Sequence, residues 1–261
     1  MIDVLLTRLR QGHRTGSYPN EAPTLPDRFR GCPSIDESRC RADCRACVEA
    51  CPTEALSRGR VGVALDLGRC IFCVECQRAC PADAISQTGT FQLSTRHRED
   101  LVARGSAVAR VPPPDDAIVR LFGRSLKLRQ VSAGGCNACE ADVNVLSTLV
   151  FDLGRFGISF VASPRHADGI LVTGPVTQNM LVALKKTYDA VPAPKIVVAV
   201  GACAISGGLY RDHPETVGGA GSVVPIDLFI PGCPPHPYTI LDGLLGVLGK
   251  LENRTVRPES G

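Results

Sequence analysis

Residues 70–81 read CIFCVECQRACP, and residues 40–52 read CRADCRACVEACP. The 70–81 stretch has the spacing C-x-x-C-x-x-C-x-x-x-C-P, with which one tight loop supplies three thiolates to an iron-sulfur cluster. The 40–52 stretch repeats this pattern with one extra residue between Cys40 and Cys44. The two motifs together predict two [4Fe-4S] clusters in the amino-terminal part of the chain.

The cysteine before the proline in each motif decides how the eight thiols are shared. In two-cluster ferredoxins this fourth cysteine ligates the other cluster, because it cannot reach the cube that its own loop surrounds. One predicted ligand set is therefore Cys40, Cys44, Cys47 and Cys80. The other predicted set is Cys51, Cys70, Cys73 and Cys76.

Because of the extra residue, the first ligand of the first set is either Cys40 or Cys32. Loop length favours Cys40, because Cys32 is followed by Pro33 and lies twelve residues before Cys44. Cys32 is then an inert thiol. The insertion predicts an intact cluster with altered hydrogen bonds to its sulfurs and so an altered reduction potential.

A zinc-stabilised scaffold is the main alternative for these cysteines. Structural zinc usually takes two C-x-x-C pairs with a longer spacer, whereas here each group of four ends in Cys-Pro. Metal analysis separates the two hypotheses. With a further cluster predicted below, three cubes require about twelve irons per chain, while a scaffold would hold roughly one to three zinc ions and no iron.

Composition narrows the class of protein. The chain has 261 residues, with 29 basic and 26 acidic side chains, so its charge indicates no nucleic-acid partner. Its start, MIDVLLTRLRQGHRTG, shows neither an apolar signal core nor a twin-arginine motif, and no apolar run reaches eighteen residues. We therefore expect a cytoplasmic location, where thirteen cysteines favour metal or redox chemistry over disulfides.

The pattern changes after a charged, proline-containing stretch. Four short β-branched runs predict buried parallel strands over 157–162, 169–174, 195–201 and 224–232. Apolar residues at helical spacing predict helices over 178–191 and 238–253. This alternation predicts a doubly wound, flavodoxin-like α/β domain over 121–261, preceded by an α+β ferredoxin-like domain over 1–95. The intervening linker, 96–120, includes polyproline at 112–114 and a short helix over 98–104.

Four further cysteines are predicted to meet at one edge of that sheet. Cys136 and Cys139 lie at a glycine-rich turn that enters a helix, while Cys203 and Cys233 each follow a predicted strand. Ligands of open α/β sheets bind at the carboxyl ends of the strands, so the four thiols suit a third [4Fe-4S] cluster. Buried packing cysteines, or a C-x-x-C redox pair, are the simpler alternatives.

Five motifs in the second unit carry a family resemblance. CNACE, SPRHAD, TGPVTQNM, GACAISGG and PGCPPHP occur in this order. Over about residues 121–250 they resemble the small-subunit family shared by [NiFe] hydrogenases and the complex I subunit that holds the terminal cluster. The separated Cys136 and Cys139 resemble the hydrogenase form, since complex I members have two adjacent cysteines. FGRSLKLRQVSAGGCNACE looks most like energy-converting, membrane-bound group 4 hydrogenases and formate hydrogenlyases.

The first unit resembles the two-cluster ferredoxin subunits of complex I and membrane-bound hydrogenases, including its entry segment YPNEAPTLPDRFRGCPSID. The chain thus looks like a fusion that relays electrons through three [4Fe-4S] clusters. The resemblance implies a [NiFe] large subunit, integral membrane subunits and a redox partner such as a ferredoxin or a formate dehydrogenase module. It also implies an oxidoreductase that is inactive without its complex, held peripherally on the cytoplasmic face of the inner membrane. The alternative is a complex I-like module that passes electrons to quinone.

Three more residues are singled out by this resemblance. Glu140, which directly follows Cys139, is a proton relay at the large-subunit interface or a solvated carboxylate favoured by the helix N-terminus. Arg165 and His166 are expected on a loop at the cysteine edge of the sheet. They either contact the large subunit or hydrogen-bond loop carbonyls.

Overall fold

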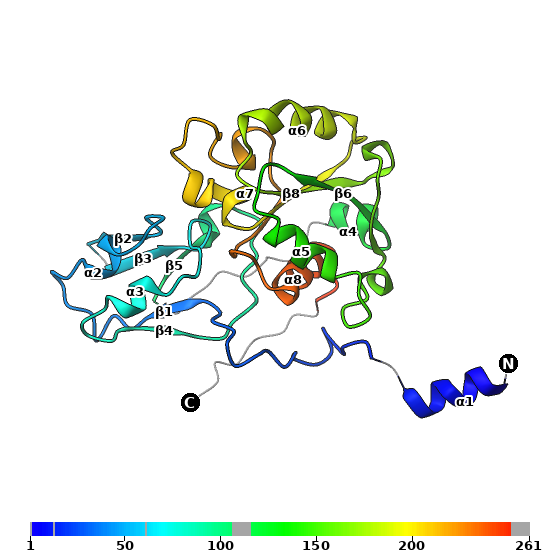
Figure 1. Cartoon of the computed structure of the whole chain (residues 1–261), viewed down its shortest axis with the longest axis horizontal. Coiled ribbons are helices and arrows are strands. Elements are labelled where there is room, and N and C mark those ends of the chain that lie inside the picture. Colours follow the sequence, from blue (N-terminus) through cyan, green and yellow to red (C-terminus); the bar gives the residue numbers. More distant parts are fainter. Residues whose placement is uncertain (1, 13, 61, 106–115, 252–261) are drawn as a thin grey trace.

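Two units with different secondary structure follow one another in the computed structural model, which describes residues 2–12, 14–60, 62–105 and 116–251 (Figure 1). The predicted polyproline at 112–114 lies outside the described residues. Of the predicted linker, residues 96–105 and 116–120 are described, and each stretch contains secondary structure.

The carboxyl-terminal unit is built on a parallel five-stranded sheet. Its strands are β6 (Leu126–Ser132), β7 (Ile158–Phe160), β8 (Gly169–Thr173), β9 (Ile196–Val200) and β10 (Leu228–Ile230). Their spatial order is β10-β9-β8-β6-β7, and every neighbouring pair is parallel. This is the flavodoxin-like order, with the topological switch point between β6 and β8. The predicted fold class is therefore confirmed.

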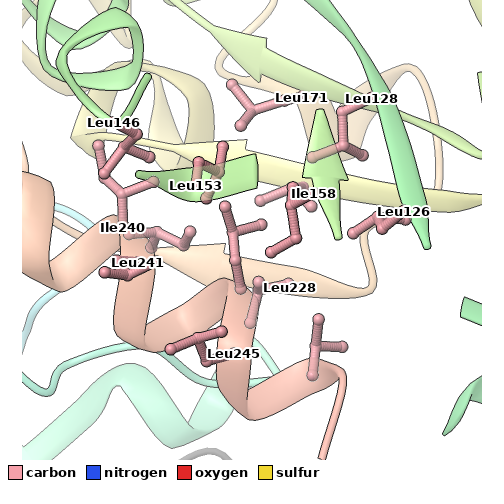
Figure 2. Packing of buried hydrophobic residues seen from close by; sticks show 14 of the residues in the cluster. Leu126, Leu128, Leu146, Leu153, Ile158, Leu171, Leu228, Ile240, Leu241 and Leu245 are labelled. Atoms are coloured by element: carbon pink, nitrogen blue, oxygen red, sulfur yellow. The ribbon is translucent and has the colours of Figure 1, made fainter. Parts of the chain in front are cut away.

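Helices cover both faces of this sheet. One face carries α4 (Asp116–Phe122), α5 (Ala138–Val145) and α8 (Pro237–Val247), and the other carries α6 (Gln178–Ala190) (Figure 1). Figure 2 shows part of the buried cluster on the first of these faces, which includes Leu126, Leu128, Ile158, Leu146 and Ile240. A short helix, α7 (Ala202–Ser206), follows β9, and single turns are η2 (Leu153–Phe156), η3 (Pro164–His166), η4 (Gly208–Tyr210) and η5 (Ala220–Ser222).

The predicted second-unit elements differ from the observed ones mainly at their ends. The four predicted strands form β7 to β10, and the two predicted helices form α6 and α8. The last helix ends at Val247 rather than at 253, because Gly249 adopts a left-handed φ of 68° and caps it. Residues 252 and 253 lie outside the described residues.

The amino-terminal unit consists of two small antiparallel sheets and two short helices. β1 (Pro33–Ile35) pairs with β4 (Ile85–Gln87), and β3 (Gly62–Asp66) pairs with both β2 (Leu56–Gly59) and β5 (Val102–Arg104). The helices are α2 (Ala46–Glu49) and α3 (Glu75–Arg78). The helix expected over 98–104 is wrong: a single turn, η1 (Glu99–Leu101), leads into β5, whose Ala103 is buried opposite Leu65.

The two units share packing. Ala204, Ile205 and Phe229 of the second unit belong to the same buried cluster as Leu67 and Leu101 of the first. Phe229 also pairs with Thr95 in an antiparallel bridge. The unit that carries the two cysteine motifs therefore packs against the β10 edge of the parallel sheet.

An amino-terminal arm completes the structure. Tyr18 is buried in the core of the second unit, where its hydroxyl donates to Asp242. α1 (Ile2–Gln11) lies at the end of the arm, away from both units, with no buried side chain (Figure 1). Among the described residues, the longest helices are too short or too polar to span a bilayer.

Candidate metal centres

The first thiol set lines a small pocket in the amino-terminal unit. Cys40, Cys44 and Cys47 come from the first motif, and Cys80 comes from the end of the second. Ile35, Val63 and Ile85 are among the apolar residues that complete the lining. We refer to these four cysteines as set 1.

A second pocket holds the complementary thiols. Cys70, Cys73 and Cys76 come from the second motif, and Cys51 comes from the end of the first. We refer to these four cysteines as set 2. The fourth cysteine of each motif thus lies with the other motif's three, which is the grouping that the proline rule predicts. Ligation by these sets stays a prediction.

Backbone geometry repeats around the exchanged cysteines. The amide of Ala55 donates to Cys51 Sγ at 3.2 Å, and the amide of Ala84 donates to Cys80 Sγ at 3.3 Å. In each case the residue preceding the donor, Glu54 or Asp83, has a left-handed φ, 50° or 47°. Amide donors to sulfur stabilise thiolate, the form that binds iron. The internal repeat is therefore present in structure as well as in sequence.

Cys32 lies outside both sets. Its side chain is buried, it lines neither pocket, and its Sγ donates to the carbonyl of Pro33 at 3.4 Å. Burial raises the pKa of Cys32 to about 12, as burial also raises the pKa of Cys139 and Cys203, so its place outside the pockets is what separates it from the predicted ligands. The position of Cys40 in the first pocket supports Cys40 as the ligand.

A third group of cysteines, set 3, gathers at the carboxyl edge of the parallel sheet. Cys136 follows β6, Cys139 lies in α5, Cys203 lies in α7, and Cys233 follows β10. Burial raises the pKa of Cys203 to about 11, and the nearby Cys233 and Cys136 raise it further. The pKa of Cys139 is raised in the same way, by burial and then by Cys203. Mutual effects of this kind require that the four thiols lie close together.

Glycine makes room for set 3. Gly201, between β9 and α7, has a φ of 89°, and a Cβ there would lie 2.6 Å from Cys139 Sγ. A Cβ on Gly208 would lie 3.0 Å from Cys203 Sγ. Sequence reasoning missed both residues, although GACAISGG contains them. The backbone can lie this close to the two thiols because these positions have no side chain.

Each of the three sets consists of four thiols, which are donors for iron and for zinc. Where burial and neighbouring thiols raise the pKa of a thiol, as at Cys139 and Cys203, its free anion is unfavourable, and a bound metal would remove this cost by ionising it. Within the described ranges, no three Cys, His, Asp or Glu side chains are placed to hold one metal ion. Four thiols in one place are the donor set that an iron-sulfur cluster takes.

The sets lie in a row. Cys47 of set 1 and Cys76 of set 2 belong to one packed cluster, and Cys47 contributes to raising the pKa of Cys76. Cys73 of set 2 and Cys233 of set 3 line one cleft together with Phe72 and His236. Set 2 is thus between set 1 and set 3.

The chain matches two family models. The model described as NADH ubiquinone oxidoreductase, 20 Kd subunit, covers residues 136–247, and a 4Fe-4S dicluster domain model covers residues 39–84. The probable membrane-bound hydrogenase subunit mbhJ of Pyrococcus furiosus is 42% identical over 147 residues, which is 55% of this chain and 88% of the relative. The chain belongs to the 20 Kd subunit family.

Other relatives of this 20 Kd subunit family member come from two kinds of complex. Formate hydrogenlyase subunit 7 of Escherichia coli is 41% identical over 138 residues, 53% of this chain and 54% of the relative. An NADH-quinone oxidoreductase subunit of Citrifermentans bemidjiense is 45% identical over 119 residues, 46% of this chain and 69% of the relative. With its dicluster domain, the chain is an iron-sulfur subunit of an oxidoreductase that transfers electrons.

Glu140 is not the solvated carboxylate that one of the two hypotheses predicts. Its side chain is buried, with 5% exposed. Ser132 Oγ, at the end of β6, and Thr173 Oγ1, at the end of β8, each donate to Glu140 Oε1 at 2.6 Å. Sequence reasoning missed both hydroxyls. The solvated interpretation is therefore wrong in this family member, and Glu140 belongs to a polar group beneath set 3.

The loop with Arg165 and His166 is also placed differently. Both side chains are exposed on η3, which leads into the amino end of β8. Asp168, at the end of this loop, accepts a hydrogen bond from the amide of Lys127 at the start of β6. The loop therefore lies toward the amino ends of the strands, and the expectation that it shares the cysteine edge is wrong.

Proposed function

We propose that this 20 Kd subunit family member relays electrons through three [4Fe-4S] clusters to or from a [NiFe] active site on a partner large subunit. The row formed by sets 1, 2 and 3 carries this proposal, because it gives a continuous route from one unit to the other. Each cluster, when bound, would take up and release electrons at a potential that its surroundings tune.

The chain's own residues have the following proposed roles. Twelve thiolates bind the clusters: Cys40, Cys44, Cys47 and Cys80; Cys51, Cys70, Cys73 and Cys76; and Cys136, Cys139, Cys203 and Cys233. Backbone amides such as those of Ala55 and Ala84 hold the exchanged sulfurs in orientation. The shared core around Phe229 fixes set 2 relative to set 3.

Domain extent and partners are part of the proposal. The ferredoxin-like domain of 1–95 and the sheet domain of 121–261 are joined by 96–120, although β5 and α4 support a shorter connection. The large subunit would cover set 3, where Cys136 and Cys233 are exposed. Integral membrane subunits would hold the complex at the cytoplasmic face of the inner membrane. A ferredoxin or a formate dehydrogenase module would exchange electrons with set 1.

Nickel in the co-purified large subunit tests this proposal. We expect nickel there, together with hydrogen-linked activity of the complex and none of this chain alone. The separated Cys136 and Cys139 favour this result over quinone reduction, the second candidate function, which the relationship to the NADH-quinone oxidoreductase relative supports. A nickel-free large subunit in a quinone-reducing complex would establish the second candidate instead.

Substitution of Glu140 by glutamine tests the proton-relay role. The amide oxygen can still accept from Ser132 and Thr173, so the fold and set 3 should persist. The complex should lose about 10²-fold to 10⁴-fold in turnover, the usual loss when a proton-transfer group is removed. Asp142→Asn, on the same helix, is the matched control and should retain activity. Wild-type turnover in Glu140→Gln, with iron content unchanged, would remove Glu140 from the proton path.

A further inference from the structure

Arg58 reaches the lengthened loop of the first cysteine motif from a neighbouring strand. It lies on β2, in register with Val63 of β3, so the ladder fixes its backbone. Its Nη1 donates to the carbonyl of Cys44 at 2.9 Å, and its Nη2 donates to the carbonyl of Arg41 at 2.7 Å. Nη1 also lies 3.4 Å from Cys40 Sγ as a donor. One guanidinium therefore contacts both ends of the loop and a set 1 sulfur.

In the second motif, the sulfur of the first cysteine accepts a hydrogen bond from a backbone amide, and in the first motif it accepts one from Arg58. At the corresponding position in set 2, the amide of Phe72 donates to Cys70 Sγ at 3.4 Å. In the described part of the chain, the donor to Cys40 Sγ is the Arg58 side chain and not a backbone amide. The extra residue between Cys40 and Cys44 thus changes the donor from a neutral amide to a cation. Arginine suits this task, because its planar fork serves several acceptors at once.

We propose that Arg58 is a positioning residue that closes the lengthened loop and raises the reduction potential of the set 1 cluster above the value it would have without this cation. Reduction adds negative charge to the cluster and its thiolates, and a cation donating to Cys40 Sγ stabilises the reduced form more than the oxidised form. The proposal rests on the ligand role proposed above for Cys40.

Redox titration of the anaerobically purified full-length chain, followed by electron paramagnetic resonance, tests this. In Arg58→Gln, we expect about twelve irons, as in the wild type. One of the three titrating signals should shift to a lower potential. At a fixed potential its reduced-to-oxidised ratio should fall about tenfold, which is about 59 mV for one electron. The shifted signal should be the one that Cys40→Ser alters. Arg58→Lys, which keeps the charge, should shift that signal less.

Arg60→Gln is the matched control, because it removes the same charge from an exposed side chain one step beyond β2. It should leave all three potentials unchanged. Wild-type potentials in Arg58→Gln, or an equal shift in Arg60→Gln, would overturn the proposal. Loss of about four irons from both Arg58 variants would also overturn it, since Arg58 would then act only in assembly. A wild-type chain without a set 1 signal would instead contradict the proposed function.

Discussion

Replacing Cys80 with alanine is expected to abolish the set 1 cluster, although Cys80 belongs to the second motif. Cys80 lines the first pocket with Cys40, Cys44 and Cys47. Iron should fall from about twelve to about eight per chain, because one cube is lost and two remain. The signal that disappears should be the one lost in Cys40→Ala. Cys51→Ala should instead remove the signal lost in Cys73→Ala, because Cys51 lines the second pocket.

Cys32→Ala is the matched control for these variants, since it removes a thiol that lines neither pocket. It should retain all three signals and about twelve irons. If Cys80→Ala removed the set 2 signal, each motif would serve its own cluster, and the exchange would be refuted. If Cys32→Ala lost the set 1 signal while Cys40→Ala kept it, the ligand role would move to Cys32.

Substitution of Gly201 by valine is expected to destroy set 3. A Cβ at this position lies 2.6 Å from Cys139 Sγ, and the φ of 89° is unfavourable for a β-branched residue. Iron should fall to about eight per chain, with the set 1 and set 2 signals intact. The complex should then lose electron transfer to its partner, because set 3 is the last in the row.

Gly221→Ala is the control in the same unit. Its Cβ would meet only Ile226 Cγ1, at 3.9 Å, and its φ is not in the left-handed region. It should keep about twelve irons and full activity of the complex. Full iron content in Gly201→Val would show that the backbone can move away from Cys139, and that the close approach is not needed for set 3.

The strands that could be predicted are those whose burial is visible in their residue types. IVVAV and GILVT form β9 and β8, which are buried along their whole length. β6 was missed because LKLRQVS carries Lys127 and Arg129, which alternate with buried leucines. In the sheet, β6 lies between β8 and β7. Because β7 is only three residues long and pairs with residues 126–128, the rest of β6 has a neighbouring strand on one side only. A central strand with charged residues therefore looks like a loop in sequence.

The grouping of the cysteines into three sets could be predicted, because it follows from the spacing within each motif and from the position of cysteines just after strands. The side chains that contact these sets could not be predicted. Ser132 and Thr173 meet Glu140 only because β6 and β8 are neighbours in the sheet. Arg58 meets Cys40 only because β2 runs beside the first loop. Such contacts depend on register between segments, which spacing alone does not specify.

Iron and zinc analysis of the anaerobically purified full-length chain, with a redox titration, tests the three-cluster relay most directly. Sets 1, 2 and 3 predict about twelve irons per chain, no zinc, and three separate one-electron signals. Roughly one to three zinc ions per chain with no iron would contradict the relay and would indicate a structural scaffold.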